Sequence, residues 1–125
     1  MFGPFAGTRC RRVAYLYRTA RFSRLEHPPV QRQDFDQSLQ QSEAPPAGAS
    51  LPVTALWWVC KRNWQTAHDL IDQAPGLDEA WVHAFLHRME GDQGNADYWY
   101  RRAGKVRPNE TIGKELEQLL NHFLN

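Results

Sequence analysis

The chain has 125 residues, a formal net charge of +1 and two cysteines, Cys10 and Cys60. This length allows a single domain, and two cysteines without nearby partners exclude a disulfide framework and a cysteine-based zinc site. The apolar runs are too short for a transmembrane helix. A reducing compartment is the simplest interpretation, and we therefore expect a cytoplasmic protein.

Residues 1–33 are rich in arginine and poor in acidic residues. Residues 1–32 carry seven arginines against Glu26 alone, about +6, whereas the remainder of the chain carries about −5. The apolar run at 13–17 is shorter than the roughly 7–15 residues of a secretory signal. Three alternatives fit: a poorly ordered leader or non-native extension, an organellar transit peptide, and a nucleic-acid-binding arm. We favour the first, and expect no nucleic-acid binding outside residues 1–32.

Residues 34–50 are expected to form a short helix followed by a linker. Phe35 and Leu39 are four residues apart, which favours one or two helical turns with an apolar anchor. Residues 43–50 are rich in Pro, Ala, Gly and Ser, a composition typical of a linker. We therefore expect the globular domain to cover 51–125.

Two helices are predicted at the start of that domain. Ser50 is a candidate N-cap and Pro52 suits the first turn, which predicts a helix over 51–62. Asn63 marks a tight turn before a second helix over 64–73. The dipeptide Pro-Gly that follows Ala74 ends this second helix.

Three further helices complete the expected fold. The first runs over 78–90 with Asp78 as N-cap, and a loop over 91–94 follows it. Asn95 is expected to cap the next helix and Asn109 the last one. An apolar stripe on the last helix consists of Ile112, Leu116, Leu119, Leu120 and Phe123.

The spacing of small and aromatic residues indicates helical hairpins. Ala96, Tyr100 and Ala103 share one helix face and Pro108 follows them, which is typical of the second helix of a tetratricopeptide repeat. A similar pattern begins 29 residues earlier, at Ala67, compared with a usual period of about 34. We therefore predict an all-α fold of two tetratricopeptide-like hairpins and a C-terminal capping helix. The residues expected to be buried are Trp58, Ala67, Ile71, Ala84, Ala96, Tyr100, Ala103 and Leu116.

Residues 83–103 carry the motif His-x3-His-Arg-x-Glu-Gly-Asp-x2-Asn-Ala-x-Tyr-Trp-Tyr-Arg-Arg-Ala. With Asn63-Trp64 before it, this motif resembles that of a family of small uncharacterised bacterial proteins. The resemblance covers about residues 34–106 and implies that residues 1–33 are extra. It implies a fold and no chemistry. A small turn residue is expected before Asn63, and Cys60-Lys61-Arg62 stands there, so the first turn is expected to be less regular.

His83, His87 and Glu90 form a polar stripe on the helix over 78–90. Three interpretations are open: hydrogen-bonded histidines at a helix interface, acid–base or ligand-binding residues, and a metal site that His68 joins. We favour the first, because His-x3-His lacks the internal glutamate of the zinc peptidase motif. No cofactor or metal is then required. The partners expected for the two histidines are Tyr100, Asn95 and Glu90.

A second candidate site combines arginines with aromatic residues. Arginine suits carboxylate recognition and stacking on aromatic rings, although Asp97 could instead pair with Arg101 within the helix, at about 0.2–0.5 kcal/mol. The candidate binding residues are Trp81, Tyr98, Trp99, Arg101 and Arg102. The leading hypothesis is a small interaction module that binds a peptide or protein partner through a groove lined by these residues. The alternative is a small-molecule or metal-dependent enzyme that uses His83, His87 and Glu90.

Overall fold

The computed structural model describes residues 29–124, and the predictions made for residues 1–28 lie outside this range. The helices are α2 (Arg32–Gln41), α3 (Leu51–Cys60), α4 (Trp64–Ile71), α5 (Leu77–Met89), α6 (Gln93–Arg102) and α7 (Ile112–Leu124). Residues 29–124 contain no strand, so the predicted all-α class is confirmed for this part of the chain. None of these helices has the length and apolar content needed to span a bilayer.

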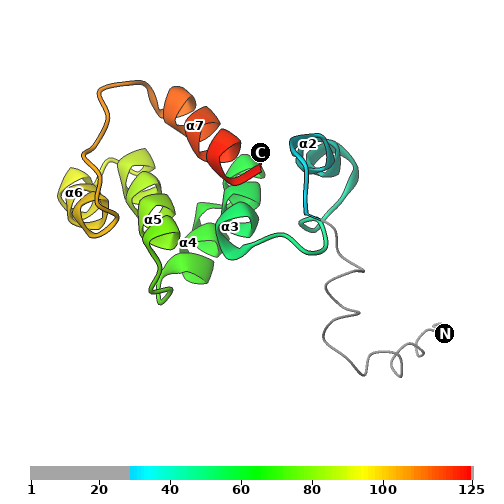
Figure 1. The fold of residues 1–125 in the computed structure, drawn as a ribbon, viewed down its shortest axis with the longest axis horizontal. Coiled ribbons are helices and arrows are strands. Elements are labelled where there is room, and N and C mark those ends of the chain that lie inside the picture. Colours follow the sequence, from blue (N-terminus) through cyan, green and yellow to red (C-terminus); the bar gives the residue numbers. More distant parts are fainter. Residues whose placement is uncertain (1–28, 125) are drawn as a thin grey trace.

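Neighbouring helices pack in pairs along the chain (Figure 1). A three-residue turn separates α3 from α4, and the two helices lie against each other; α5 and α6 do the same across a short loop. A longer connection then leads from α6 to α7, which packs against α3 and α5. α2 lies against α3 and α7 at the other side of the molecule.

Local side-chain caps start the first two helices of the predicted domain. The Ser50 hydroxyl accepts a hydrogen bond from the Val53 N–H at 3.3 Å, as the sequence predicts for α3. The Asn63 side chain accepts one from the Thr66 N–H at 3.1 Å and so caps α4. Arg62 has a φ of 63°, in the left-handed region that non-glycine residues rarely adopt. This position makes the turn between α3 and α4 an irregular one.

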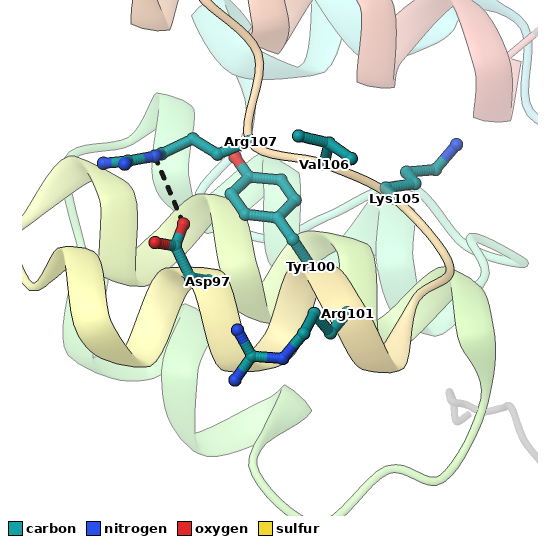
Figure 2. A pocket seen from close by; sticks show the side chains of 6 residues that line it. All are labelled: Asp97, Tyr100, Arg101, Lys105, Val106 and Arg107. Atoms are coloured by element: carbon teal, nitrogen blue, oxygen red, sulfur yellow. Dashed lines mark ion pairs between the residues drawn. The ribbon is translucent and has the colours of Figure 1, made fainter.

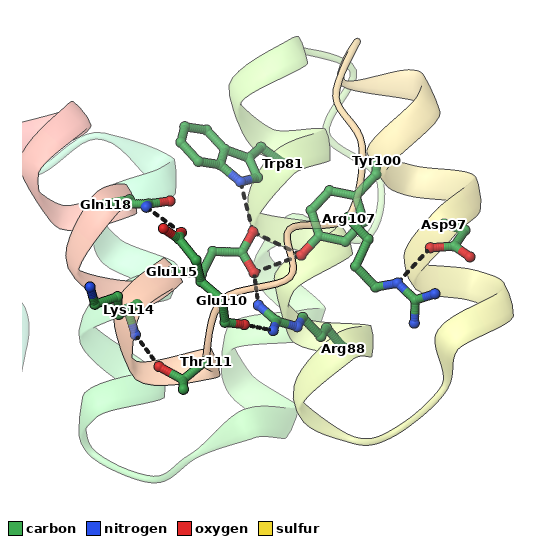
Figure 3. Close-up of polar contacts among 10 residues, drawn as sticks. All are labelled: Trp81, Arg88, Asp97, Tyr100, Arg107, Glu110, Thr111, Lys114, Glu115 and Gln118. Carbon is green, nitrogen blue, oxygen red and sulfur yellow. Dashed lines mark hydrogen bonds and ion pairs between the residues drawn. The ribbon is translucent and has the colours of Figure 1, made fainter.

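The N-caps predicted for the three later helices are wrong. α5 begins after Gly76, and Asp78 lies in its first turn, where its charge still complements the helix dipole. The Asp92 carboxylate accepts from the Asn95 N–H at 3.2 Å, so Asp92 caps α6. Thr111, not Asn109, caps α7 by accepting from the Lys114 N–H at 3.1 Å (Figure 3). Several acceptable cap residues stand within a few positions of each start, and spacing alone does not select among them.

Small and aromatic residues form the core between the helices. Six of the eight residues predicted to be buried are so: Ala67, Ile71, Ala84, Ala96, Tyr100 and Ala103. Trp58 and Leu116 are only partly buried, whereas Trp57 is fully buried. The prediction missed Trp57 because α3 is apolar on all sides, so its sequence does not single out one buried face.

α2 belongs to the same core as the predicted domain. Phe35 is fully buried in this core, and the partly buried Leu39 packs against the same core. The Trp57 indole N–H donates to the Ser38 hydroxyl at 2.8 Å. The arginine-rich composition of residues 1–33 placed Arg32 in the predicted leader. In the structure Arg32 is the first residue of α2, and its guanidinium pairs with the Glu117 carboxylate at 3.1 Å. The packed unit therefore begins before residue 51, contrary to the boundary expected from the linker composition.

Candidate functional site

Three histidines from α4 and α5, His68, His83 and His87, meet between these helices and form a histidine cluster. His83 and His87 retain only 2% and 8% of their accessible surface, so both face the interior as their spacing predicts. His83 Nε2 lies 3.2 Å from His68 Nε2. His87 Nδ1 lies 2.8 Å from Glu90 Oε2.

The predicted partners of these histidines are right in one case of three. Glu90 contacts His87, but the Asn95 amide instead donates to Asp92 at 2.8 Å. The Tyr100 hydroxyl donates to a buried carboxylate of α7. The spacing of residues along α5 and α6 identifies which faces meet, and does not identify which side chains become partners across them.

Two tryptophans enclose the histidine cluster. The Trp64 ring stacks on His68 with centroids 4.8 Å apart, and the Trp99 ring stacks on His83 at 3.9 Å. The Trp64 indole N–H donates to the Leu86 carbonyl at 2.8 Å, which holds that ring in place. Trp64 was not among the site residues predicted from the sequence, although its i, i+4 spacing with His68 on one helix was a signal for it.

His83 is held in its neutral form. Burial, reinforced by the neighbouring His68 and His87, lowers the pKa of His83 to about 4, against the opposing effect of Asp72. Among the described residues, its Nδ1 atom has no hydrogen-bond partner. An unsatisfied buried polar atom costs about 1–3 kcal/mol. Within residues 29–124, hydrogen bonding therefore uses the Nε2 atom of His83, which faces His68, and leaves its Nδ1 atom unsatisfied.

The depressed pKa of His83 predicts a pH-dependent stability. The free energy of unfolding should decrease as the pH falls from about 6.5 to about 4, because the unfolded chain takes up a proton that the folded chain excludes. Above about pH 6.5 the contribution is fully present, at about 1–3 kcal/mol after allowance for solvent screening. Urea denaturation in the presence of a chelator measures it. His83→Phe should flatten the profile and the exposed His122→Phe should not; equal slopes for both variants would contradict the assignment.

A second polar cluster surrounds Glu115 of α7 (Figure 3). Its carboxylate retains 1% of its surface and accepts from Arg88 Nη1 at 2.6 Å, from the Tyr100 hydroxyl at 2.7 and 2.8 Å, and from Trp81 Nε1 at 3.1 Å. Arg88 also donates to the Glu110 carbonyl. Burial, with the hydrogen bond to Glu115, raises the pKa of Tyr100 well above its usual value. This Glu115 network attaches α7 to α5 and α6.

Sequence reasoning missed Glu115, although a signal was present. Glu115 precedes Leu119 by four residues, so it lies on the apolar stripe of the last helix. A carboxylate on an apolar helix face is either paired or expensive to bury, and that pattern could have identified Glu115 as part of a buried network.

The five predicted binding residues do not form one groove. Tyr98, Trp99 and Arg102 lie together, with the Arg102 guanidinium 5.3 Å from the Trp99 ring centroid, close to the histidine cluster. Trp81 and Arg101 instead line hollows near the α6–α7 connection. The prediction placed both arginines in one site, but adjacent residues on a helix point in directions about 100° apart.

The hollow beside α6 is basic (Figure 2). This basic hollow has a volume of about 240 Å³ and adjoins a second one of about 330 Å³. Asp97 pairs with Arg107 at 3.2 Å, not with Arg101 as the spacing allowed. Lys105 Nζ lies 4.1 Å from the Trp81 ring centroid. The residues lining the basic hollow are Asp97, Tyr100, Arg101, Lys105, Val106 and Arg107.

The described residues thus present two candidate sites on different faces of α6. The histidine cluster is largely buried and contains the neutral imidazole of His83, whereas the basic hollow is open and cationic. Family models, curated proteins and solved structures were all compared with the chain, and none matches it.

Proposed function

We propose that this protein is a small helical interaction module that binds a short acidic segment of a partner protein in the basic hollow. The observation that carries this proposal is the arrangement of Arg101, Lys105 and Arg107 around one hollow with Asp97 as the single acidic lining residue. Among residues 29–124, neither Arg101 nor Lys105 makes an ion pair. The Arg101 guanidinium and the Lys105 ammonium group can therefore bind carboxylates of a ligand.

The surroundings of these cations favour a peptide over a simple anion. Val106 is 88% exposed beside the hollow and offers an apolar contact to a ligand side chain. Trp81 lies under the Lys105 ammonium group and keeps that cation beside the adjoining hollow. Arginine can bind a carboxylate through two parallel hydrogen bonds, which gives directional recognition. An acidic residue next to an apolar one matches this combination of groups.

The helix arrangement supports a tetratricopeptide-like scaffold for this module. The α3–α4 and α5–α6 pairs are two consecutive hairpins, and α7 covers α3 and α5. Ala84 and Ala96 are fully buried with Tyr100 between α5 and α6, where small residues allow close approach of the helices. We include this architecture in the proposal, with α7 as the capping helix.

Charge reversal at one position of α6 tests the proposal. Arg101→Glu should weaken binding of a fluorescein-labelled peptide containing Asp-Glu-Leu by at least about 10-fold, because it replaces a favourable charge pair with repulsion. Arg102→Glu is the matched control, since it makes the same charge change on the neighbouring residue, which lies against Tyr98 and Trp99. It should change the affinity by less than about 2-fold. Fluorescence anisotropy measures both affinities.

Two outcomes would reject the proposal. Equal losses in Arg101→Glu and Arg102→Glu would show a general charge effect and no defined site. Absence of saturable binding to the intact chain, while a peptide of reversed charge binds, would show that the hollow does not select acidic segments.

The alternative function, an enzyme that uses His83, His87 and Glu90, stays a prediction. One contact favours it: the 2.8 Å separation of His87 and Glu90 is suitable for an acid–base pair. The burial of both histidines leaves a substrate little access to the two rings. The geometry therefore supports the interaction module better.

A further inference from the structure

The histidine cluster gathers three nitrogen ligands from two helices. His83 and His87 are separated by one turn of α5, and His68 faces them from α4. One ring nitrogen from each residue can be chosen so that all three lie within 4.8 Å of one another. We infer that His68, His83 and His87 bind one divalent transition-metal ion, with Zn²⁺ as the favoured ion.

The spacing of two of these nitrogens already suits a tetrahedral ion. Zn–N bonds of about 2.0–2.1 Å at tetrahedral angles separate two ligand nitrogens by about 3.3–3.4 Å. The His68 and His83 Nε2 atoms are 3.2 Å apart. All three nitrogens lie within 4.8 Å of one another, so a bound ion would bring any wider pair to the same separation of about 3.3–3.4 Å. His68 is only partly buried, which leaves the site accessible to an ion from the solvent.

Acidic side chains near the cluster favour a cation within it. Glu90 contacts His87 at 2.8 Å, and Glu90 and Asp92 both offer carboxylate oxygens within 4.8 Å of a His87 ring nitrogen. A cation held by the three imidazoles lies near these carboxylates, which partly compensate its charge.

Glu90 supplies an orienting contact of the kind that metal sites use. A metal-binding histidine commonly donates its second ring N–H to a carboxylate, which fixes the ring and strengthens the ligand. His87 Nδ1 is 2.8 Å from Glu90 Oε2, so its Nε2 atom is left for the ion. The indole rings of Trp64 and Trp99 restrict the His68 and His83 rings from outside. Three nitrogens with these supports leave a fourth position for water.

A neighbouring combination of residues competes for the same ion. His87, Glu90 and Asp92 also offer ligand atoms within 4.8 Å of one another. Asp92, however, is engaged as the cap of α6, where it accepts from the Asn95 backbone and side chain. Zinc also binds imidazole readily. The imidazole trio is therefore the preferred site, and substitution of Asp92 separates the two possibilities.

Metal titration of the full chain tests the inference. After removal of metal with a chelator, Co²⁺ should bind with one ion per chain and give the intense visible absorption of a tetrahedral site, and Zn²⁺ should displace it. His68→Phe and His83→Phe should each weaken Zn²⁺ binding by more than about 100-fold, and Glu90→Gln by about 10–100-fold. Phenylalanine preserves the aromatic stacking, and circular dichroism checks that each variant is folded.

Two matched variants make the result decisive. His122→Phe removes an exposed histidine of α7, and Asp92→Asn removes the competing oxygen ligand; both should leave the Zn²⁺ affinity unchanged within about 2-fold. If His83→Phe fails to fold, the partly buried His68→Phe still decides the question. Absence of saturable binding, or binding that His68→Phe leaves intact, would overturn the inference. Loss of binding in Asp92→Asn would move the site to the competing residues.

Discussion

Replacing Glu115 with alanine should lower the free energy of unfolding by about 3–5 kcal/mol. The substitution leaves the Arg88 guanidinium, whose side chain is only 13% exposed, without its carboxylate partner. Tyr100 and Trp81 lose their acceptor in the same change. A buried charge without compensation is more costly than the pair itself is favourable, and this asymmetry sets the size of the effect. Urea denaturation followed by tryptophan fluorescence measures the loss.

The control for this substitution lies on the same helix. Glu117 pairs with Arg32 at 3.1 Å, but its side chain is 57% exposed. Glu117→Ala should therefore cost less than about 1 kcal/mol. Similar losses of unfolding free energy for Glu115→Ala and Glu117→Ala would contradict the buried network. They would show that Glu115 does not attach α7 to α5 and α6.

Replacing Tyr100 with alanine should cost about 3–5 kcal/mol, as large aromatic truncations in cores do. Tyr100 retains 1% of its surface and fills the space between α5 and α6 beside Ala84 and Ala96. The neighbouring alanines are too small to close the resulting cavity. The hydroxyl also donates to Glu115, so the variant removes one contact of that carboxylate. Chemical denaturation measures the change, and an unchanged midpoint would refute this packing.

A conservative variant separates the ring of Tyr100 from its hydroxyl. Tyr100→Phe keeps the packing and removes only the donor to Glu115, so it should cost about 1–3 kcal/mol. Tyr98, which is 45% exposed on the same helix, provides the surface control. Because Tyr100 and Glu115 share a hydrogen bond, their substitutions should not be additive in a double-mutant cycle.

α6 connects the two sites proposed above. Trp99 covers His83 on one face, and Arg101 lines the basic hollow on another. The Glu115 network lies between α6 and α7, next to that hollow, because Tyr100 contributes to both. Stability variants at Tyr100 are therefore expected to weaken peptide binding as well, whereas Arg101→Glu should leave stability nearly unchanged.

The sequence by itself determined the class and approximate extent of the helices. Ser50 and Asn63 cap α3 and α4 through residues three positions away. α4 ends at Ile71, two residues before the predicted end at 73 and ahead of Pro75-Gly76. The buried face of α6 followed from the spacing of Ala96 and Tyr100. These features depend on contacts within one helical turn, so the residues that decide them are adjacent in the sequence.

The tertiary structure alone decided which side chains meet across helices. Glu115 contacts Trp81, Arg88 and Tyr100, which are 34, 27 and 15 residues away in the sequence. His83 contacts His68, which is 15 residues away. The burial of Phe35 likewise depends on the packing of α2 against α3 and α7. Helical periodicity defines the face that a residue occupies; the neighbour on that face is set by helix crossing and loop path, which local sequence does not encode.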